Sequence, residues 1–347
     1  MLKKWAAMLL CLIAAANLSA CSKNNQASSP AATTAAEESS TAESSAEQTS
    51  AAEESKIKVT VTFDAMKEFV AAVGKDKVEI STVIPAGTEA HDFEPKAQDL
   101  AGISDAKVFV YNGLGMEGWV EDAISAVNNT ELIVVEASKG ADVIERETDS
   151  EDHEEDGDHE EEADHEEDGE DGHSHGKYDP HLWLSLKGAQ TEVENIKDAL
   201  VQADPANKEY YEQNSNDYIA KLESLYNEYS DKFQSAEKKT FVTGHAAFGY
   251  LCRDFGLVQN SVRDIFAEGE PSAQQLAQLV EYCRENNVTT IFAEEMVSPA
   301  VSETLANEVG AAVETVYTIE SAQDDMTYLE RMESNLSKIY DSLTGNS

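Results

Sequence analysis

The chain has 347 residues and a formal net charge of −43, from 68 aspartates and glutamates against 25 lysines and arginines. A negative field of this size repels nucleic acid and anionic lipid headgroups and attracts cations. The sequence has no long run of basic residues, so we expect no nucleic-acid partner. The composition favours a protein whose ligand is a cation.

The first twenty residues have the pattern of a secretory signal peptide. Lys3 and Lys4 precede an apolar run from Trp5 to Ala16 that is too short to span a bilayer. The ending Leu-Ser-Ala-Cys21 resembles a bacterial lipobox, which implies cleavage before Cys21 and lipidation of its thiol. The alternatives are an uncleaved anchor and a plain signal peptide followed by a chance cysteine. We expect an extracytoplasmic protein, lipid-anchored to the outer face of a bacterial cell membrane.

Residues 21–55 are mostly Ser, Ala, Thr, Glu and Gln, without periodic apolar positions. Such a segment buries no core, so it is predicted to be a disordered tether. About 290 residues follow, which is enough for two lobes.

Residues 56–185 and 238–347 both alternate strand-like and helix-like patterns. In the first segment, Asp64 can cap a helix that carries Met66, Phe69, Val70 and Val73. Alternating β and α elements predict an α/β fold with two lobes, each a parallel sheet covered by helices. Strands are predicted at 57–63, 78–84, 107–111, 131–135, 240–243, 290–293 and 312–317, and helices of the second lobe at 246–255, 272–286 and 302–309.

Residues 186–237 lie between the two lobes. They are charged and nearly free of glycine, with apolar residues at helical intervals. This pattern predicts a long linker helix with a candidate interruption near Asp204-Pro205.

Residues 145–177 form an acidic, His-rich insertion in the first lobe. A hexapeptide repeat starts at Asp152, Asp158 and Asp164, and residues 149–172 carry 16 acidic residues and no basic one. Like charges at this density predict disorder without a ligand. Histidines among carboxylates predict capture of divalent ions, and the alternative is a solvating loop with incidental histidines. The histidines concerned are His153, His159, His165, His173 and His175.

Only two cysteines, Cys252 and Cys283, remain after removal of the signal peptide and lipidation of Cys21. In an exported protein an even pair is usually a disulfide, so we expect a Cys252–Cys283 bond. The alternative is two buried free thiols, because both residues fall within amphipathic helical patterns.

Three further histidines, His91, His181 and His245, stand outside the insertion. Each lies where a strand-like run ends at Gly or Pro before a helical pattern. In parallel α/β sheets this edge is where ligands bind. Three neutral imidazoles are most of a tetrahedral metal site, so the sequence predicts a transition-metal site with zinc as first candidate.

The segments around these histidines carry a resemblance to a known family. Together they resemble the zinc-type solute-binding lipoproteins of ABC importers, the cluster A-I or cluster 9 family. The resemblance implies two α/β lobes, a rigid linking helix, a metal held between the lobes, and an acidic insertion before the second ligand. It also implies a monomer that works with an ABC permease and its cytoplasmic ATPase. The segments are 85–95, 179–184, 243–250 and 291–295.

The resemblance implies His91, His181 and His245 as metal ligands. Manganese-type relatives often carry a carboxylate where His245 stands, so the imidazole favours zinc, with manganese as the alternative. Relatives place a fourth, carboxylate ligand shortly before the last helix, which corresponds to Asp325 or, one residue earlier, Asp324. Some members use a glutamate directly before the first histidine, where this chain has Ala90.

Glu294 and Glu295 follow a predicted strand and are weaker candidates for the fourth ligand. Their alternative roles are to orient a histidine or to cap the next helix. Three histidines with an open position also fit a zinc hydrolase, but the chain has no H-E-x-x-H helix or other catalytic signature. We therefore expect no enzyme. A surface adhesin with a structural metal is a further alternative.

Overall fold

The computed structural model describes residues 56–146, 176–263, 271–295 and 299–345. The predicted signal peptide with Cys21, the tether, and residues 147–175 of the insertion with its five histidines lie outside the described residues. Among the residues that the structure describes, no helix is both long enough and apolar enough to cross a membrane.

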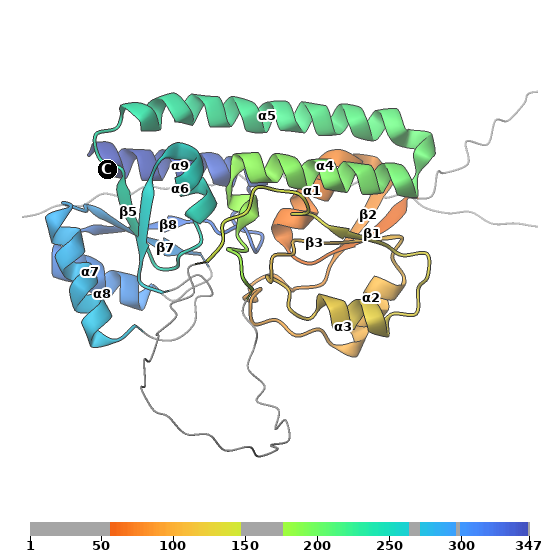
Figure 1. The fold of residues 1–347 in the computed structure, drawn as a ribbon, viewed down its shortest axis with the longest axis horizontal. Helices are drawn as coiled ribbons and strands as arrows, with labels where there is room; N and C mark the ends of the chain where they lie inside the picture. The colour runs from red at the N-terminus through yellow and green to blue at the C-terminus, as the bar shows by residue number, and fades with distance from the viewer. Residues whose placement is uncertain (1–55, 147–175, 264–270, 296–298, 346–347) are drawn as a thin grey trace, which may run out of the picture. The chain divides into compact units, whose positions relative to one another are not determined.

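The N-terminal lobe is a four-stranded parallel sheet with the strand order β2-β1-β3-β4 (Figure 1). Its strands are rich in Val and Ile, whose branched side chains suit a sheet that is covered by helices. The elements are β1 (Ile57–Val61), α1 (Asp64–Gly74), the 3-10 turn η1 (Lys75–Lys77), β2 (Val78–Thr82), α2 (Ala97–Ser104), β3 (Val108–Tyr111), α3 (Val120–Ala126) and β4 (Ile133–Glu136).

The C-terminal lobe repeats this topology with the strand order β6-β5-β7-β8, again all parallel. In each sheet the chain leaves the first strand for one neighbour and later returns to its other side. The carboxyl end of that first strand is therefore a topological switch point, where α/β proteins bind ligands. The elements are β5 (Thr240–Thr243), α6 (Gly249–Phe255), β6 (Val258–Ser261), α7 (Ala273–Glu285), β7 (Thr290–Glu294), α8 (Ala300–Val309), β8 (Ala312–Val316) and α9 (Tyr328–Thr344).

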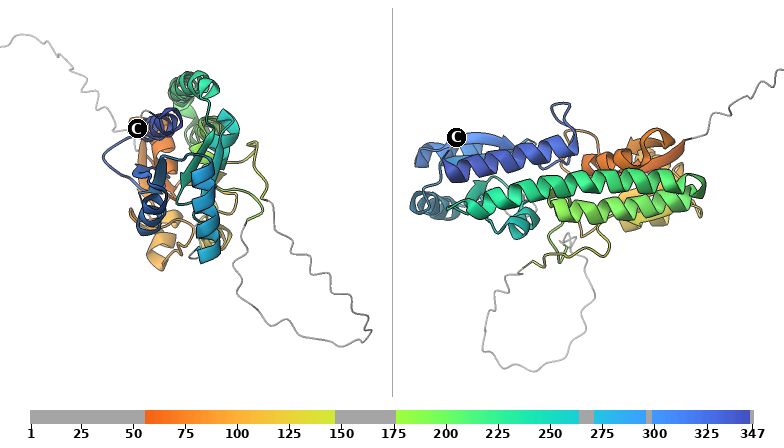
Figure 2. Two further views of the ribbon diagram at one scale, coloured as in Figure 1. Left: turned by 90° about the vertical axis from the view of Figure 1, so that its left-hand side faces the viewer. Right: turned by 90° about the horizontal axis from the view of Figure 1, so that it is seen from above.

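The segment between the lobes consists of two helices rather than one. After the 3-10 turn η2 (Leu182–Leu184), α4 (Leu186–Ala203) ends at Asp204, and Pro205 opens the 3-10 turn η3 (Pro205–Asn207). The second helix, α5 (Lys208–Ser235), has 28 residues and is about 42 Å long at 1.5 Å per residue. It contacts α1 of the first lobe and α6 and α9 of the second (Figure 2).

One continuous apolar core joins both sheets to these helices. It includes Val59 of β1, Phe233 of α5 and Phe292 of β7, all at most 1% exposed. Trp183 of η2 is fully buried in the same cluster and meets the ring of Phe63 edge-on at 4.8 Å. The ends of the two sheets are therefore held in place by shared packing rather than by the linker alone.

The two ends of the acidic insertion are paired with each other. Glu145 and Tyr178 form an antiparallel β-bridge, the amide of Arg146 donates to the Lys177 carbonyl, and the amide of Asp179 donates to the Ile144 carbonyl. The two ends of the lobe that flank residues 147–175 are thus hydrogen-bonded to each other.

The structure corrects the expected disulfide. Cys252 on α6 and Cys283 on α7 are both buried free thiols, which was the alternative. Cys252 packs in the large core that joins the lobes, whereas Cys283 packs in a separate cluster with Leu279 and Leu305. Counting cysteines could not show that the two helices direct them into different cores.

We expect both thiols to be inert in the native protein. Burial raises the pKa of Cys252 to about 12 and that of Cys283 to about 11, so both side chains stay in the thiol form. The thiolate is the reactive form, and the thiol reacts poorly. Alkylation without reductant should modify neither thiol in native protein and both after denaturation. A denatured protein whose mass shows neither Cys252 nor Cys283 modified would contradict this prediction.

Glu192 on α4 gives a second prediction. The residue is fully buried, and neither carboxylate oxygen has a hydrogen-bond partner among the described residues. Burial, and then the charge of Glu117, raise the pKa of Glu192 well above its usual range. The folded state therefore binds a proton that the unfolded state releases, and the free energy of unfolding falls as pH rises above the unfolded pKa of about 4.5.

Replacing Glu192 by Gln should remove this dependence, because a neutral amide has the same shape as the protonated acid. The free energy of unfolding of the variant should equal that of the wild type near pH 4. Above this pH, the difference between them should grow in favour of the variant by up to about 1.4 kcal/mol per pH unit. Chemical denaturation at several pH values measures this difference. Glu194→Gln on the same helix, at a partly exposed position, is the control and should show a constant difference.

Candidate metal centre

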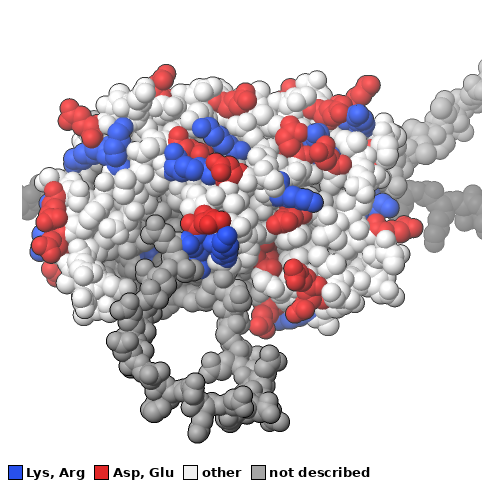
Figure 3. Space-filling model, in the orientation of Figure 1, with Lys and Arg blue, Asp and Glu red and all other residues white. Residues whose placement is uncertain are grey.

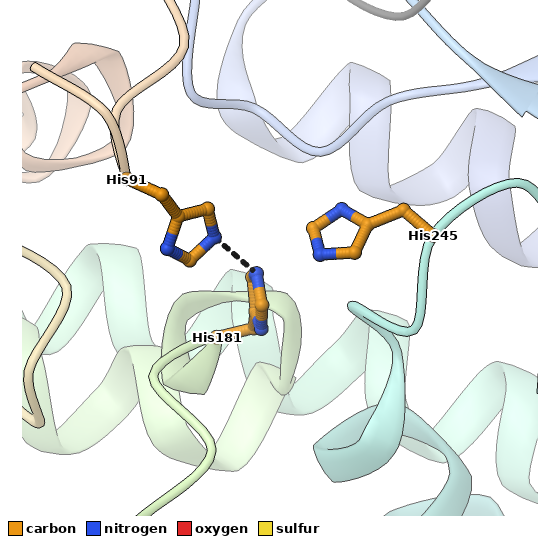
Figure 4. Close-up of side chains that lie close together, drawn as sticks. All are labelled: His91, His181 and His245. Carbon is orange, nitrogen blue, oxygen red and sulfur yellow. Dashed lines mark hydrogen bonds between the residues drawn. The ribbon is translucent and has the colours of Figure 1, made fainter. Parts of the chain in front are cut away.

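The structure brings His91, His181 and His245 together from three segments (Figure 4). His91 lies in the loop after β2, His181 at the start of η2, and His245 just after β5. Their ligand nitrogens all lie within 4.8 Å of one another. The Nε2 atoms of His91 and His181 are 3.2 Å apart, and two nitrogens bound to one tetrahedral zinc are about 3.3 Å apart. The pair already has the spacing of two ligands of one ion.

Asp179 fixes the orientation and the tautomer of His181. Its Oδ1 atom accepts from the backbone amide of His181 at 2.9 Å and from Nδ1 of the ring at 2.9 Å. With the proton on Nδ1, the lone pair of Nε2 is directed at His91. Burial lowers the pKa of His181 to about 3, so its ring is neutral at physiological pH. A neutral, oriented imidazole is the form that binds a metal.

His245 is held by its backbone. Glu294, the last residue of β7, accepts from the His245 amide at 2.9 Å, while Gln259 donates to the His245 carbonyl at 2.8 Å. The residue before it must be glycine, because a Cβ at Gly244 would overlap the Glu294 carboxylate. Burial raises the pKa of Glu294 to about 8.

Glu294 and Glu295 therefore have the alternative role that the sequence left open. Neither belongs to the groups of potential ligands that the structure forms among the described residues. Glu294 orients the backbone of His245, and Glu295 accepts from the amides of Thr318 and Ile319.

The structure does not bring Asp324 or Asp325 to the three histidines. Both are exposed, in a turn where each has a positive φ, of 55° and 54°. Asp324 instead accepts from the Tyr317 hydroxyl at 2.7 Å. Both line a surface cavity of about 350 Å³ next to Asp64. Neither aspartate belongs to the groups of potential metal ligands among the described residues, so the structure does not support the expected fourth ligand.

Two carboxylates that sequence reasoning missed lie beside His91 instead. Glu89, His91 and Glu320 form a second group with all ligand atoms within 4.8 Å of one another. Glu320 is 5% exposed, and its Oε2 atom has no hydrogen-bond partner among the described residues. Burial, and then the neighbouring Glu89, raise the pKa of Glu320 well above its usual range.

A signal for Glu320 was present in the sequence. The residue follows the predicted strand at 312–317, so it lies at a strand end as His91 and His245 do. A buried carboxylate oxygen without a partner is costly unless a cation meets it. Three imidazoles and one such carboxylate form the donor set of a tetrahedral zinc site.

Two parallel α/β lobes with a ligand cluster at their facing strand ends, held by a long helix across both, define a metal-binding solute receptor. Comparison with known proteins agrees. The family model of the periplasmic zinc-uptake complex component A, ZnuA, matches residues 59–342. The chain belongs to this family.

Similar proteins carry zinc in their names. The chain is 43% identical over 293 residues to the high-affinity zinc uptake system protein ZnuA of Bacillus subtilis (strain 168), covering 83% of this chain and 88% of that protein. It is 35% identical over 291 residues to the zinc-binding lipoprotein AdcA of Streptococcus pneumoniae (strain ATCC BAA-255 / R6), covering 82% of this chain and 55% of AdcA. A zinc-bound crystal structure of a ZnuA deletion mutant superposes with a TM-score of 0.69 at 29% identity, covering 83% of this chain and 98% of that one.

The link between Asp179 and His181 can be tested by removing the carboxylate. Asp179→Ala should weaken zinc binding about 10–100-fold, because the ring of His181 loses its fixed tautomer and direction. Competition with a zinc chelator measures the loss. The control is Ser272→Ala, which removes a helix cap on α7 at a cost of about 1 kcal/mol and should leave zinc affinity unchanged. Equal affinities of Asp179→Ala and wild type would contradict the assignment.

Proposed function

We propose that this protein is the extracytoplasmic high-affinity zinc receptor of an ABC-type importer. It captures the ion at the cluster of His91, His181 and His245 and delivers it to the permease, whose cytoplasmic ATPase drives transport. The observation that carries this proposal is the convergence of the three imidazoles, with the buried carboxylate of Glu320, in the turn after β8, beside His91. Membership in the zinc-uptake family supports it.

The proposed ligands are His91, His181, His245 and Glu320. Three nitrogen donors favour zinc over manganese, because manganese prefers oxygen donors. The neutral ring of His181 and its anchoring by Asp179 prepare this part of the site before an ion arrives. The relatives that bear zinc in their names agree with this choice of metal.

A receptor explains the site better than a hydrolase does. Catalytic zinc keeps one coordination position open for water, whereas four protein ligands close a tetrahedral site. With Glu320 as the fourth ligand, no position is left for a nucleophile. The relatives ZnuA and AdcA are named as an uptake system protein and a zinc-binding lipoprotein.

The location follows from the N-terminus and the family. Cleavage before Cys21 and lipidation of its thiol would anchor the protein to the outer face of the membrane, and residues 21–55 would act as a tether. The name of AdcA as a lipoprotein supports this anchoring. The protein acts as a monomer. On the face shown in Figure 3, Lys and Arg lie beside Asp and Glu rather than in a separate basic patch.

The acidic insertion serves the same function in a different way. Its five histidines capture ions weakly and raise the local zinc concentration near the cluster. The two ends of the insertion are paired at Glu145 and Tyr178, and Tyr178 directly precedes Asp179.

Histidine substitutions test the site. In a variant that lacks residues 149–175, replacing His91, His181 or His245 by Ala should each weaken zinc binding by at least about 100-fold, because each removes a direct ligand. The parent variant should retain one tight site and lose the weaker ones. Isothermal titration with zinc measures both, and circular dichroism confirms that the lobes stay folded.

Three outcomes would contradict the proposal. A parent variant without any tight zinc site would make the insertion the main binding element. If a strain without this gene grew as well as the wild type when zinc is limiting, the proposed role in zinc uptake would be wrong. Zinc-dependent hydrolysis by the saturated protein would favour the hydrolase.

A further inference from the structure

The turn that carries Glu320 has a strained backbone. Ile319, directly before Glu320, has a φ of 61°, and its side chain is fully buried. This left-handed conformation is unfavourable for a β-branched residue and costs on the order of 1–3 kcal/mol. Such a conformation persists only where the surrounding contacts hold it, so these contacts determine where Glu320 lies.

Glu295 makes the contact at the strained residue itself. Its Oε2 accepts from the Thr318 amide at 2.8 Å, and its Oε1 accepts from the Ile319 amide at 3.1 Å. Two successive backbone N–H groups thus point at one carboxylate, as in the anion-binding concavities that form around left-handed residues. The Glu295 side chain is partly buried, so water competes less well for these amides.

The same turn is tied to two of the other three ligand segments. The indole Nε1 of Trp183 donates to the Thr318 carbonyl at 2.7 Å, which joins the turn to the segment of His181. The amide of Gly87 donates to the Ser321 hydroxyl at 2.9 Å, which joins it to the loop of His91. The turn is therefore fixed on both sides of Ile319.

Glu294 and Glu295 are neighbours at the end of β7, and their carboxylates serve different segments. Glu294 accepts from the amide of His245, and Glu295 accepts from the amides before Glu320. One dipeptide thus supports the backbone of two proposed ligands that lie far apart in the sequence.

We propose that Glu295 is a positioning residue for the metal site. It holds Ile319 in the left-handed conformation and thereby keeps the Glu320 carboxylate beside His91. This inference rests on the proposed function, in which Glu320 is a zinc ligand. Without Glu295 the backbone at Ile319 relaxes, Glu320 leaves the site, and zinc retains the three imidazoles with one position open to water.

A double-mutant cycle in the full chain tests this role. Glu295→Gln offers one acceptor oxygen to two amides, and it should lower zinc affinity about 10–100-fold in competition with a chelator. In the Glu320→Gln background the same change should have no further effect, because the ligand that it positions is gone. Cobalt provides the spectroscopic signature: both single variants should show the same change in the visible absorption of the bound ion, because in both of them water replaces the Glu320 carboxylate.

Glu330→Gln is the matched control. The Glu330 carboxylate also accepts a backbone amide, that of Thr327, but at the start of α9. It should keep wild-type zinc affinity and the wild-type cobalt spectrum. If Glu295→Gln does not fold, Glu295→Asp, which retracts the carboxylate by one methylene, takes its place in the same cycle.

The outcomes separate this inference from the proposed function. A wild-type protein without tight zinc binding overturns the proposed function. Tight binding in wild type that Glu320→Gln leaves unchanged overturns Glu320 as a ligand and this inference with it. Wild-type affinity in Glu295→Gln, or losses that add in the double variant, overturn the positioning role while the three-histidine receptor stands.

Discussion

The cluster depends on one constraint: the carboxyl ends of two separate parallel sheets must stay directed at the same point. Neither sheet alone supplies enough ligands, since His91 comes from the first lobe and His245 from the second. The constraint is met by packing. Trp183 is buried beneath the cluster, and α5 contacts helices of both lobes, so the side chains that hold the lobes together also set the spacing of the ligands.

Burial of the cluster has two opposite electrostatic effects. It lowers the pKa of His181, which leaves a ring ready to bind a cation. It raises the pKa of Glu320, which disfavours an isolated negative charge in the same place. Both effects arise because a low-dielectric site resists any unbalanced charge. Both shifts favour the neutral forms of His181 and Glu320, and an arriving divalent ion supplies the charge that makes the carboxylate favourable.

Much of this arrangement could be predicted from local patterns, and the failures have physical causes. The alternation of Val-rich strands with capped helices gave both sheets, and the break at Pro205 followed from its missing amide. The strand β6 was missed because Gln259 and Asn260 give it no apolar alternation. The disulfide was wrong because sequence spacing does not show which core a helix faces. Glu320 was overlooked although its place after the predicted strand at 312–317 was a signal, because that place alone does not show that its side chain is buried beside His91.

The closed base of the acidic insertion has a consequence for how such proteins can diverge. The backbone pairing of residues 144–146 with residues 177–179 completes the lobe on its own, and the energetic cost of a surface loop rises only slowly with its length. Residues 147–175 can therefore be lengthened, shortened or altered in composition while Asp179 and His181 keep their places. Selection can adjust this loop without having to rebuild the site itself.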